Sequence, residues 1–197
     1  MKELILEMEE YASLKNIPII EKDSIAFIMK YIKKNNIKNI LEIGSAIGYS
    51  TILMASVDRD VTVTTIERDE ARYMECLKNV KKCGFEKKIN VVFQDALDVN
   101  LTGVKYDMIF IDAAKGQYIK FFEKFKYFLN DGGVIITDNL KFHGYVGKSK
   151  EIESKNLRGL AQKIEDYIEF LKNNQEFETN FYDVGDGLSV SVKKDEK

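Results

Sequence analysis

Two aspartates and an asparagine stand where apolar segments of the sequence stop. Asp112 follows residues 106–111, and Asp138 and Asn139 follow residues 134–137. Carboxylate and amide oxygens without histidine or cysteine suit hard cations such as Mg²⁺, Ca²⁺ or Mn²⁺. If the two segments are neighbouring strands, about 4.8 Å apart, their terminal side chains converge at one edge of a sheet. The trio therefore predicts a divalent metal site, although an Asp-Asn pair is also common in turns.

Lys115 lies close to Asp112 in the sequence, just before a helix expected over residues 118–129. A cation at the start of a helix opposes the helix dipole, at a cost of roughly a few tenths of a kcal/mol. A residue placed against its local electrostatics indicates a use for it, although most lysines are simply solvated. Beside a divalent metal, the pKa of its ammonium group can be lowered so that the neutral amine acts as a base, or the ammonium can hold a developing oxyanion.

A second group of residues has the composition of a cofactor loop. Residues 39–51, NILEIGSAIGYST, contain an apolar run, a turn with Gly44 and Gly48, and a helix that opens near Ile47. Glycine permits a sharp turn or a ligand against bare backbone, and a helix start offers unpaired N–H groups. The spacing G-x-x-x-G predicts a nucleotide-type cradle, but it differs from the dinucleotide pattern G-x-G-x-x-G and so disfavours a nicotinamide dehydrogenase.

Acidic residues also follow two further apolar runs. Glu67 lies 23 residues after Gly44, close to the offset of about 20 at which an acid reaches a ribose hydroxyl pair. We therefore predict that Glu67 binds a ribose, the alternative being a solvated strand end. Asp95 and Ala96 follow the next run, and their position alone places them at the adenine edge.

The segments that must hold these residues alternate in periodicity. Apolar stripes at helical spacing over residues 4–11 and 25–32 predict two helices before the first strand. Strands and helices then alternate, which is typical of a parallel sheet covered by helices on both faces. The predicted strands are residues 37–43, 61–66, 89–93, 106–111 and 134–137, and the predicted helices are residues 48–57, 69–82 and 118–129.

The C-terminal part departs from this alternation. Residues 139–155 have two glycines, many lysines and no clean period, which predicts a loop or lid. A strong helical stripe covers residues 157–171. Residues 178–183 and 188–192 alternate polar and apolar around Gly185-Asp186-Gly187, which predicts an antiparallel hairpin. We interpret this triplet as a hairpin turn rather than a phosphate loop.

Composition and charge limit the class of protein. The chain has 197 residues, 45% of them hydrophobic, and a net charge of −2, so we expect one domain over residues 1–197, with N-terminal helices in 1–36 and a core in 37–197. Cys76 and Cys83 form no metal or disulfide pattern, and one histidine, His143, does not support a Ser-His-Asp triad. Without a signal or transmembrane segment, a cytoplasmic protein that does not enter membranes is expected.

Taken together, these stretches resemble a class I S-adenosylmethionine-dependent O-methyltransferase of the metal-dependent catechol and caffeoyl-CoA type. Within that family the chain is most similar to bacterial tRNA 5-hydroxyuridine methyltransferases. The resemblance implies a Rossmann-like α/β fold with a seven-stranded, mostly parallel sheet. It covers nearly the whole chain, in the motifs LEIGSAIGYST, TTIERDEARY, FQDAL, FIDAAKGQY, GGVIITDN and VGDGLSVSVKK.

The resemblance also assigns roles to residues. It implies a homodimer, with S-adenosylmethionine and Mg²⁺ as cofactors. Asp112, Asp138 and Asn139 would hold the metal, and Lys115 would stand at the acceptor oxygen beside Asp112. The cofactor would be held by Ile20, Glu42, Gly44, Ser50, Glu67, Asp95, Ala96 and Asp112.

Three functions stay open for such a chain. The first, which the resemblance favours, is methylation of 5-hydroxyuridine at the wobble position of tRNA. Basic residues around the loop over residues 139–155 could contact the tRNA phosphates, although Glu151 and Glu153 reduce the positive charge there. These basic residues are Lys141, His143, Lys148, Lys150, Lys155 and Arg158. The second is methylation of a small hydroxylated aromatic substrate at the same site. The third is a non-catalytic RNA-binding protein that keeps the fold.

Overall fold

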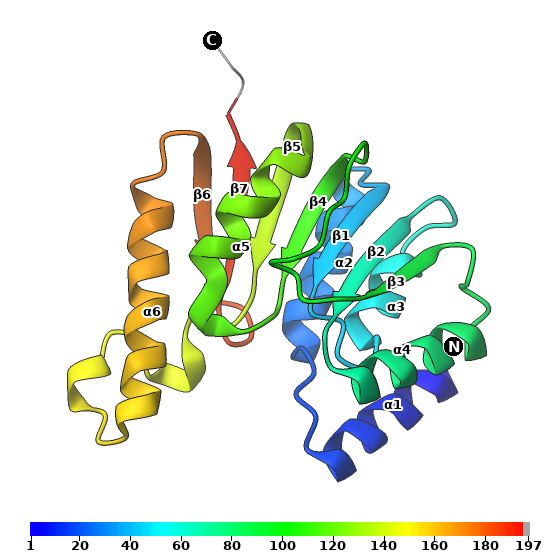
Figure 1. Cartoon of the computed structure of the whole chain (residues 1–197), viewed down its shortest axis with the longest axis horizontal. Coiled ribbons are helices and arrows are strands. Elements are labelled where there is room, and N and C mark those ends of the chain that lie inside the picture. The colour runs from blue at the N-terminus through cyan, green and yellow to red at the C-terminus, as the bar shows by residue number, and fades with distance from the viewer. Residues whose placement is uncertain (195–197) are drawn as a thin grey trace.

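A seven-stranded sheet runs through the middle of the computed structural model, which describes residues 1–194 (Figure 1). The strand order is β3-β2-β1-β4-β5-β7-β6. Strand β7 runs antiparallel to both of its neighbours, and the pairs among β1 to β5 are parallel. The strands are β1 (Asn39–Ile43), β2 (Thr62–Glu67), β3 (Ile89–Phe93), β4 (Tyr106–Ile111), β5 (Leu129–Thr137), β6 (Phe177–Tyr182) and β7 (Leu188–Lys193).

Helices cover both faces of this sheet (Figure 1). They are α1 (Lys2–Lys15), α2 (Lys22–Lys34), α3 (Tyr49–Ala55), α4 (Glu70–Lys82), α5 (Tyr118–Phe125) and α6 (Lys155–Lys172). Helices α1 to α4 contribute to one hydrophobic cluster, and α5 and α6 contribute to a second. The predicted mostly parallel α/β fold with a C-terminal antiparallel hairpin is therefore confirmed.

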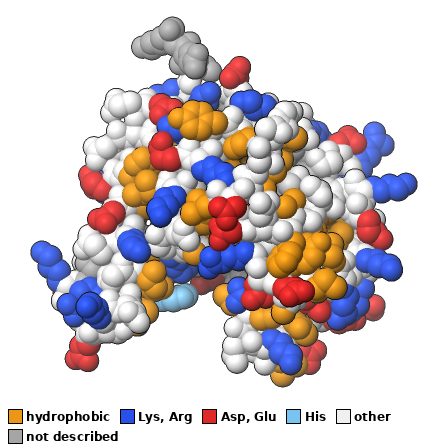
Figure 2. All heavy atoms as spheres, in the orientation of Figure 1, with side chains coloured by type: hydrophobic (Ala, Val, Ile, Leu, Met, Phe, Trp, Pro, Cys, Tyr) orange, Lys and Arg blue, Asp and Glu red, His pale blue; other side chains and the backbone are white. Residues whose placement is uncertain are grey.

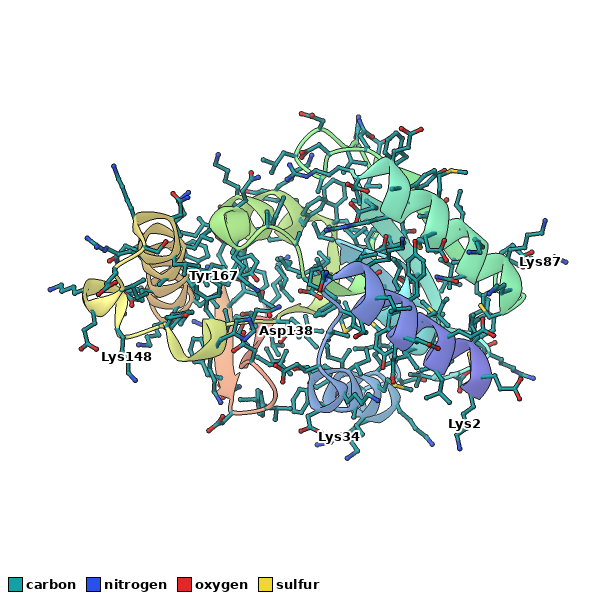
Figure 3. The ribbon with its side chains drawn as sticks, turned by 90° about the horizontal axis from the view of Figure 1, so that it is seen from below. Lys2, Lys34, Lys87, Asp138, Lys148 and Tyr167 are labelled. Carbon is teal, nitrogen blue, oxygen red and sulfur yellow. The ribbon has the colours of Figure 1, made fainter. Side chains whose placement is uncertain are left out.

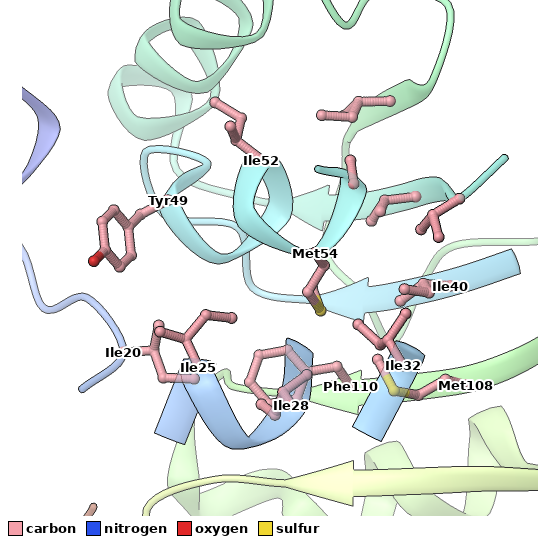
Figure 4. Packing of buried hydrophobic residues seen from close by; sticks show 14 of the residues in the cluster. Ile20, Ile25, Ile28, Ile32, Ile40, Tyr49, Ile52, Met54, Met108 and Phe110 are labelled. Carbon is pink, nitrogen blue, oxygen red and sulfur yellow. The ribbon is translucent and has the colours of Figure 1, made fainter. Parts of the chain in front are cut away.

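The alternating side chains of the central strands separate the two clusters. In β1, Ile40 belongs to the first cluster and Leu41 to the second, as expected because successive side chains of a strand point to opposite faces. Figure 4 shows the first cluster, in which Ile28 and Ile32 of α2 pack with Phe110 of β4. The central strands are therefore packed by helices on both faces.

The structure differs from the sequence prediction around β5. The predicted helix over residues 118–129 ends at Phe125, and a short 3-10 turn, η2 (Lys126–Phe128), leads into a strand that begins at Leu129 instead of Val134. Residues 130–133 are skipped in the pairing register with β4, since Leu129 pairs with Tyr106 and Val134 with Met108. Their polar and glycine content resembles a turn, which explains the late predicted start.

Two connecting segments also gain detail. Residues 95–105 contain no helix, and the loop predicted over residues 139–155 includes two 3-10 turns, η3 (Phe142–Gly144) and η4 (Ser149–Glu151). The last three residues of the range predicted for the domain, 195–197, lie outside the described part of the chain. Within residues 1–194, the helices are all too short or too polar to cross a membrane.

The strand order fixes where a ligand can bind. From β1 the chain moves to β2 and β3 on one side, and from β4 it moves to β5 on the other. Ligands of open α/β sheets bind at such a reversal, beyond the carboxyl ends of the strands. Figure 2 shows the molecule hollowed at this lower edge, between the lobe formed by α6 with the segment before it and the lobe formed by α1.

Candidate active site at the carboxyl edge of the sheet

The glycine loop lies directly against the end of β4. Gly44 adopts φ +96°, and a Cβ atom on it would lie 2.5 Å from the main-chain oxygen of Asp112. Gly48 adopts φ +86°, and a Cβ there would lie 2.8 Å from the sulfur of Cys76. Neither position has room for a side chain, and both φ values disfavour one. The bare backbone at Gly44 therefore lets the loop lie directly against the end of β4.

Glu42, in β1, anchors the helix that follows the glycine loop through buried hydrogen bonds. Its carboxylate is fully buried and accepts hydrogen bonds from Ser50 Oγ at 2.5 Å, from Thr65 Oγ1 at 2.6 Å and from Thr51 Oγ1. Burial raises the pKa of Glu42, and the three hydroxyl groups oppose that rise. The structure thus brings together Glu42 and Ser50, both predicted from sequence, and joins them to β2.

Glu67 bridges the loop and the turn after β2. Its carboxylate accepts hydrogen bonds from the N–H groups of Ala46, Arg68 and Asp69, at 3.0, 2.9 and 2.8 Å. The side chain is 7% exposed, which excludes the solvated strand end considered above. Glu67 therefore lies against the glycine loop, as a residue that shares a ligand with that loop must.

Asp95 and Ala96 follow β3, beside the end of β2. Asp95 accepts hydrogen bonds from the Leu97 N–H at 2.9 Å and from Arg68 Nη1 at 3.1 Å. The Leu97 N–H is the main cause that holds the pKa of Asp95 below its usual range, and Arg68 adds to it against burial. Ala96 is buried in the second cluster. Arg68, which the sequence did not single out, therefore connects the ends of β2 and β3.

The three predicted metal ligands converge. Asn139 Nδ2 donates to Asp112 Oδ1 at 2.9 Å, and Ser24 Oγ of α2 donates to Asp138 Oδ1 at 3.3 Å. Tyr118 OH donates to the main-chain oxygen of Asp138 at 3.1 Å. Figure 3 views this edge from below and shows Asp138 near the middle of the molecule. The ends of β4 and β5 thus meet as the sequence predicted.

Electrostatics joins Lys115 to this trio. Lys115 is half-buried in the 3-10 turn η1 (Lys115–Gln117), and burial lowers its pKa against the charges of Asp112, Asp186 and Asp138. Burial also raises the pKa of Asp112 and of Asp138, and the charge of Asp112 adds to the rise at Asp138. Lys115 is therefore not the freely solvated lysine of the alternative interpretation.

The donor set fits a hard cation in its chemistry. Two carboxylates, a side-chain amide and the Ser24 hydroxyl offer oxygen, the element that Mg²⁺ and Ca²⁺ prefer. Within the described residues 1–194, no three His, Cys, Asp or Glu side chains gather as a metal site. Any ion here would depend on the Asn139 amide as its third protein ligand.

A comparison with known protein families identifies the family of this chain. The profile of the O-methyltransferase family matches residues 1–194. The chain belongs to the O-methyltransferase family. It is an S-adenosylmethionine-dependent O-methyltransferase of the caffeoyl-CoA type.

Named relatives agree with this membership. The tapetum-specific methyltransferase 1 of Arabidopsis thaliana is 31% identical over 199 residues, covering 95% of this chain and 85% of the relative. The caffeoyl-CoA O-methyltransferase of Populus kitakamiensis is 29% identical over 192 residues, covering 92% and 80%. The crystal structure of a Staphylococcus aureus protein, provisionally named a caffeoyl-CoA O-methyltransferase, has a TM-score of 0.92 and 40% identity, covering 96% of this chain and 92% of that one.

Sequence reasoning missed three residues beside the O-methyltransferase site. Ser24 of α2 contacts Asp138, but the apolar stripe of this helix indicates only a role in packing. Arg68 pairs with Asp95. Asp186 was interpreted only as part of a turn, and it does lie in the β6–β7 hairpin, but it is 6% exposed. The position of this acid between two glycines was the one sequence feature that could have indicated a role for Asp186.

Ile20, the remaining predicted cofactor residue of the O-methyltransferase, precedes α2. It is 6% exposed and belongs to the first cluster together with Ile47 and Tyr49 of the loop–helix segment. Figure 4 shows Ile20 and Tyr49 in this cluster. Its side chain is therefore used in packing, and only its backbone is left for the predicted contact. The two cysteines, Cys76 and Cys83, are free thiols, as expected.

Proposed function

We propose that this O-methyltransferase transfers a methyl group from S-adenosylmethionine to a ring hydroxyl of a small aromatic acceptor, with Mg²⁺ held by Asp112, Asp138 and Asn139. The observation that carries this proposal is the placement of the Asp112–Asn139 pair directly against the Gly44 backbone. The proposed cofactor-binding residues and the proposed metal ligands then lie at the same carboxyl edge of the sheet. The names of the relatives point to the same acceptor class.

The cofactor half of the site lies over β1, β2 and β3. Glu67 is placed to accept hydrogen bonds from the ribose hydroxyls, because its carboxylate already faces the glycine loop. Asp95 and Ala96 stand one strand further out, where the adenine would lie. Glu42 and Ser50 support the loop beneath the methionine part, with the backbone near Ile20 beside it. This arrangement directs the methyl-bearing end toward Asp112.

The acceptor half lies over β4 and β5. Mg²⁺, when bound, would lower the pKa of the acceptor hydroxyl and orient its oxygen. Lys115, whose pKa is lowered by burial, takes up the hydroxyl proton as the neutral amine, or stabilises the oxyanion as the ammonium. The oxygen forms a bond to the methyl carbon as the carbon–sulfur bond breaks, which releases S-adenosylhomocysteine and a proton. Most of the rate gain comes from holding the two reactants in line.

The test is methyl transfer to defined acceptors. The enzyme is incubated with S-adenosylmethionine, Mg²⁺ and either caffeoyl-CoA or 3,4-dihydroxybenzoate, and the products are analysed by mass spectrometry. We expect one methyl group on a ring oxygen. Methylation of 5-hydroxyuridine in tRNA with no transfer to either aromatic acceptor would overturn the proposal.

A tRNA acceptor is the second candidate, and one observation favours it. Lys148, Lys150 and Lys155 are exposed on the lobe beside the site, where phosphates could reach them, whereas Lys141 is ion-paired with Asp183. Figure 3 shows Lys148 at the outer edge of this lobe, with Asp138 further in. Arg158 instead donates to the main-chain oxygens of Ile152 and Glu153. Loss of methoxyuridine from the tRNA of a deletion strain would support this candidate.

A further inference from the structure

The N-terminal helix α1 lies in front of the carboxyl edge of the sheet, between α2 and α4 (Figure 3). Its apolar side is buried in the first cluster. On its polar side, Glu7 pairs with Lys82 of α4 at 2.8 Å, and Glu9 pairs with Lys22 of α2 at 2.7 Å. Ion pairs therefore join α1 to the helices on either side of it.

The carboxylate of Glu9 bridges two segments of the proposed cofactor site. Its Oε1 accepts a hydrogen bond from the hydroxyl of Tyr49 at 2.8 Å, and its Oε2 accepts one from Lys22 Nζ at 2.7 Å. Tyr49 directly follows Gly48 of the glycine loop, and Lys22 follows Ile20 by two residues. One side chain of α1 therefore connects the glycine loop with the segment before α2.

The hydrogen bond from Tyr49 contributes more to this bridge than the ion pair with Lys22. Tyr49 is 4% exposed, whereas the side chain of Lys22 is 74% exposed, where an ion pair contributes little. Lys22 and then Tyr49 hold the pKa of Glu9 below its usual range, and burial raises the pKa of Tyr49. Near neutral pH a neutral hydroxyl thus donates to a charged carboxylate, and such a hydrogen bond is roughly twice as strong as one between neutral groups.

This hydrogen bond holds one neighbour of a glycine in the cofactor loop. Gly48 adopts φ +86°, and glycine has more backbone freedom than other residues. On its other side, the carbonyl of Ile47 accepts a hydrogen bond from Asn79 Nδ2 of α4 at 3.0 Å. Each neighbour of Gly48 is therefore fixed by one side chain from a helix, Ile47 through Asn79 and Tyr49 through Glu9.

We propose that Glu9 is a positioning residue for the cofactor: it acts through Tyr49 and Lys22 to hold the glycine loop and the segment before α2 in the geometry that binds S-adenosylmethionine. This inference rests on the proposed function in that these two segments are assigned to the cofactor there. A loop that is already held in its binding geometry loses less conformational entropy when the ligand binds. Helix α1 then belongs to the cofactor-binding machinery as well as to the packing of the first cluster.

The experiment measures the dissociation constant of S-adenosylhomocysteine by calorimetry on the full chain. Glu9→Ala removes the carboxylate, and Tyr49→Phe removes only the hydroxyl and keeps the ring. Each should raise the dissociation constant by about tenfold, as expected for the loss of one charge-assisted hydrogen bond. Because both changes remove the same bond, the double variant should bind no more weakly than Glu9→Ala alone.

Glu7→Ala is the matched control on the same helix. It removes the ion pair of α1 with Lys82 of α4, so it loosens the helix without touching Tyr49. Its dissociation constant should stay within about twofold of wild type. Urea unfolding of each variant measures the loss of stability separately, and a loss of stability alone leaves the affinity of the folded chain unchanged.

Wild-type affinity in Tyr49→Phe would overturn the inference, even if Glu9→Ala failed to fold. Equal weakening by Glu7→Ala would do the same, because any loosening of α1 would then be enough. Losses that add in the double variant would contradict a shared hydrogen bond. If Gly44→Ala weakens binding and neither Glu9→Ala nor Tyr49→Phe does, the role of Glu9 fails and the proposed function stands, whereas a wild type that does not bind S-adenosylhomocysteine would remove both.

Discussion

The main-chain oxygen of Asp112 occupies the space that a Cβ atom on residue 44 would need, at 2.5 Å from its ideal position. This contact joins the cofactor loop after β1 to the first acid after β4. Because main-chain atoms make this contact, the backbone sets the distance between the cofactor half and the acceptor half of the site. Changes at residue 44 should therefore disturb the binding of the cofactor more than changes at other glycines with similar φ.

Gly44→Ala should weaken binding of S-adenosylhomocysteine by about tenfold or more, because the new methyl group pushes the loop away from Asp112 and strains φ +96°. Calorimetry measures the effect. Gly84→Ala is the control, since Gly84 has φ +70° but no atom within 4 Å of its ideal Cβ position. Wild-type affinity in Gly44→Ala would show that the loop does not hold the cofactor.

Glu67→Gln should also weaken cofactor binding, by about tenfold. The glutamine amide has one acceptor oxygen instead of two, and the loop N–H of Ala46 competes for it with Arg68 and Asp69. Glu70→Gln, at the exposed start of α4, serves as the control and should bind normally. The ribose assignment fails if the two variants have equal affinities.

Removal of divalent metal should suppress methyl transfer and leave cofactor binding intact. The proposed metal ligands lie over β4 and β5, whereas the proposed ribose and adenine contacts lie over β2 and β3. The enzyme is dialysed against EDTA, assayed, and assayed again after Mg²⁺ is restored. Undiminished turnover in the chelator would remove the metal from the mechanism.

Asp107 should give a pH-dependent contribution to stability at the opposite edge of the sheet. Its carboxylate accepts hydrogen bonds from the N–H groups of Lys38 and Asn39, both at 2.9 Å, and from Asn130 Nδ2 at 2.7 Å. Burial alone would raise the pKa of Asp107, but these hydrogen bonds outweigh it and lower the pKa. A lowered pKa stabilises the fold above the unfolded value, about 3.9, and the contribution is lost as the pH falls through the folded value.

Asp107→Asn should therefore lower the free energy of unfolding by about 1 kcal/mol near neutral pH. The difference from wild type should shrink once the pH falls below about 4. Urea unfolding at several pH values measures it, with the exposed Asp131→Asn as the control. A difference that is constant with pH would rule out the carboxylate charge as its source.

The sequence alone predicted which residues of the candidate site lie together, because each strand ends at a polar residue. Parallel strands bring such ends to one edge, so Asp112, Asp138 and Asn139 could be placed together without coordinates. The glycine spacing likewise indicated the loop at Gly44. These features depend on local sequence patterns and on the rule that ligands bind at the carboxyl ends of parallel strands. A single sequence is enough to apply both.

Contacts between distant segments could not be predicted in the same way. Asp186 becomes a buried acceptor only because Gly185 packs on Ser24, more than a hundred residues earlier in the sequence. The early start of β5 was missed because residues 130–133 look like a turn, although Leu129 already pairs with Tyr106. In both cases tertiary packing overrides the local signal.

The most direct test of the central claim is a paired measurement on Asp138→Asn, a variant of nearly the same shape. Asp138 lies 2% exposed at the end of β5 and is assigned to the metal and acceptor half of the site. The account predicts that methyl transfer to the aromatic acceptor is abolished, while the affinity for S-adenosylhomocysteine stays within about twofold of wild type. An equal loss of both, or turnover at the wild-type rate, would contradict the division of the site into two halves.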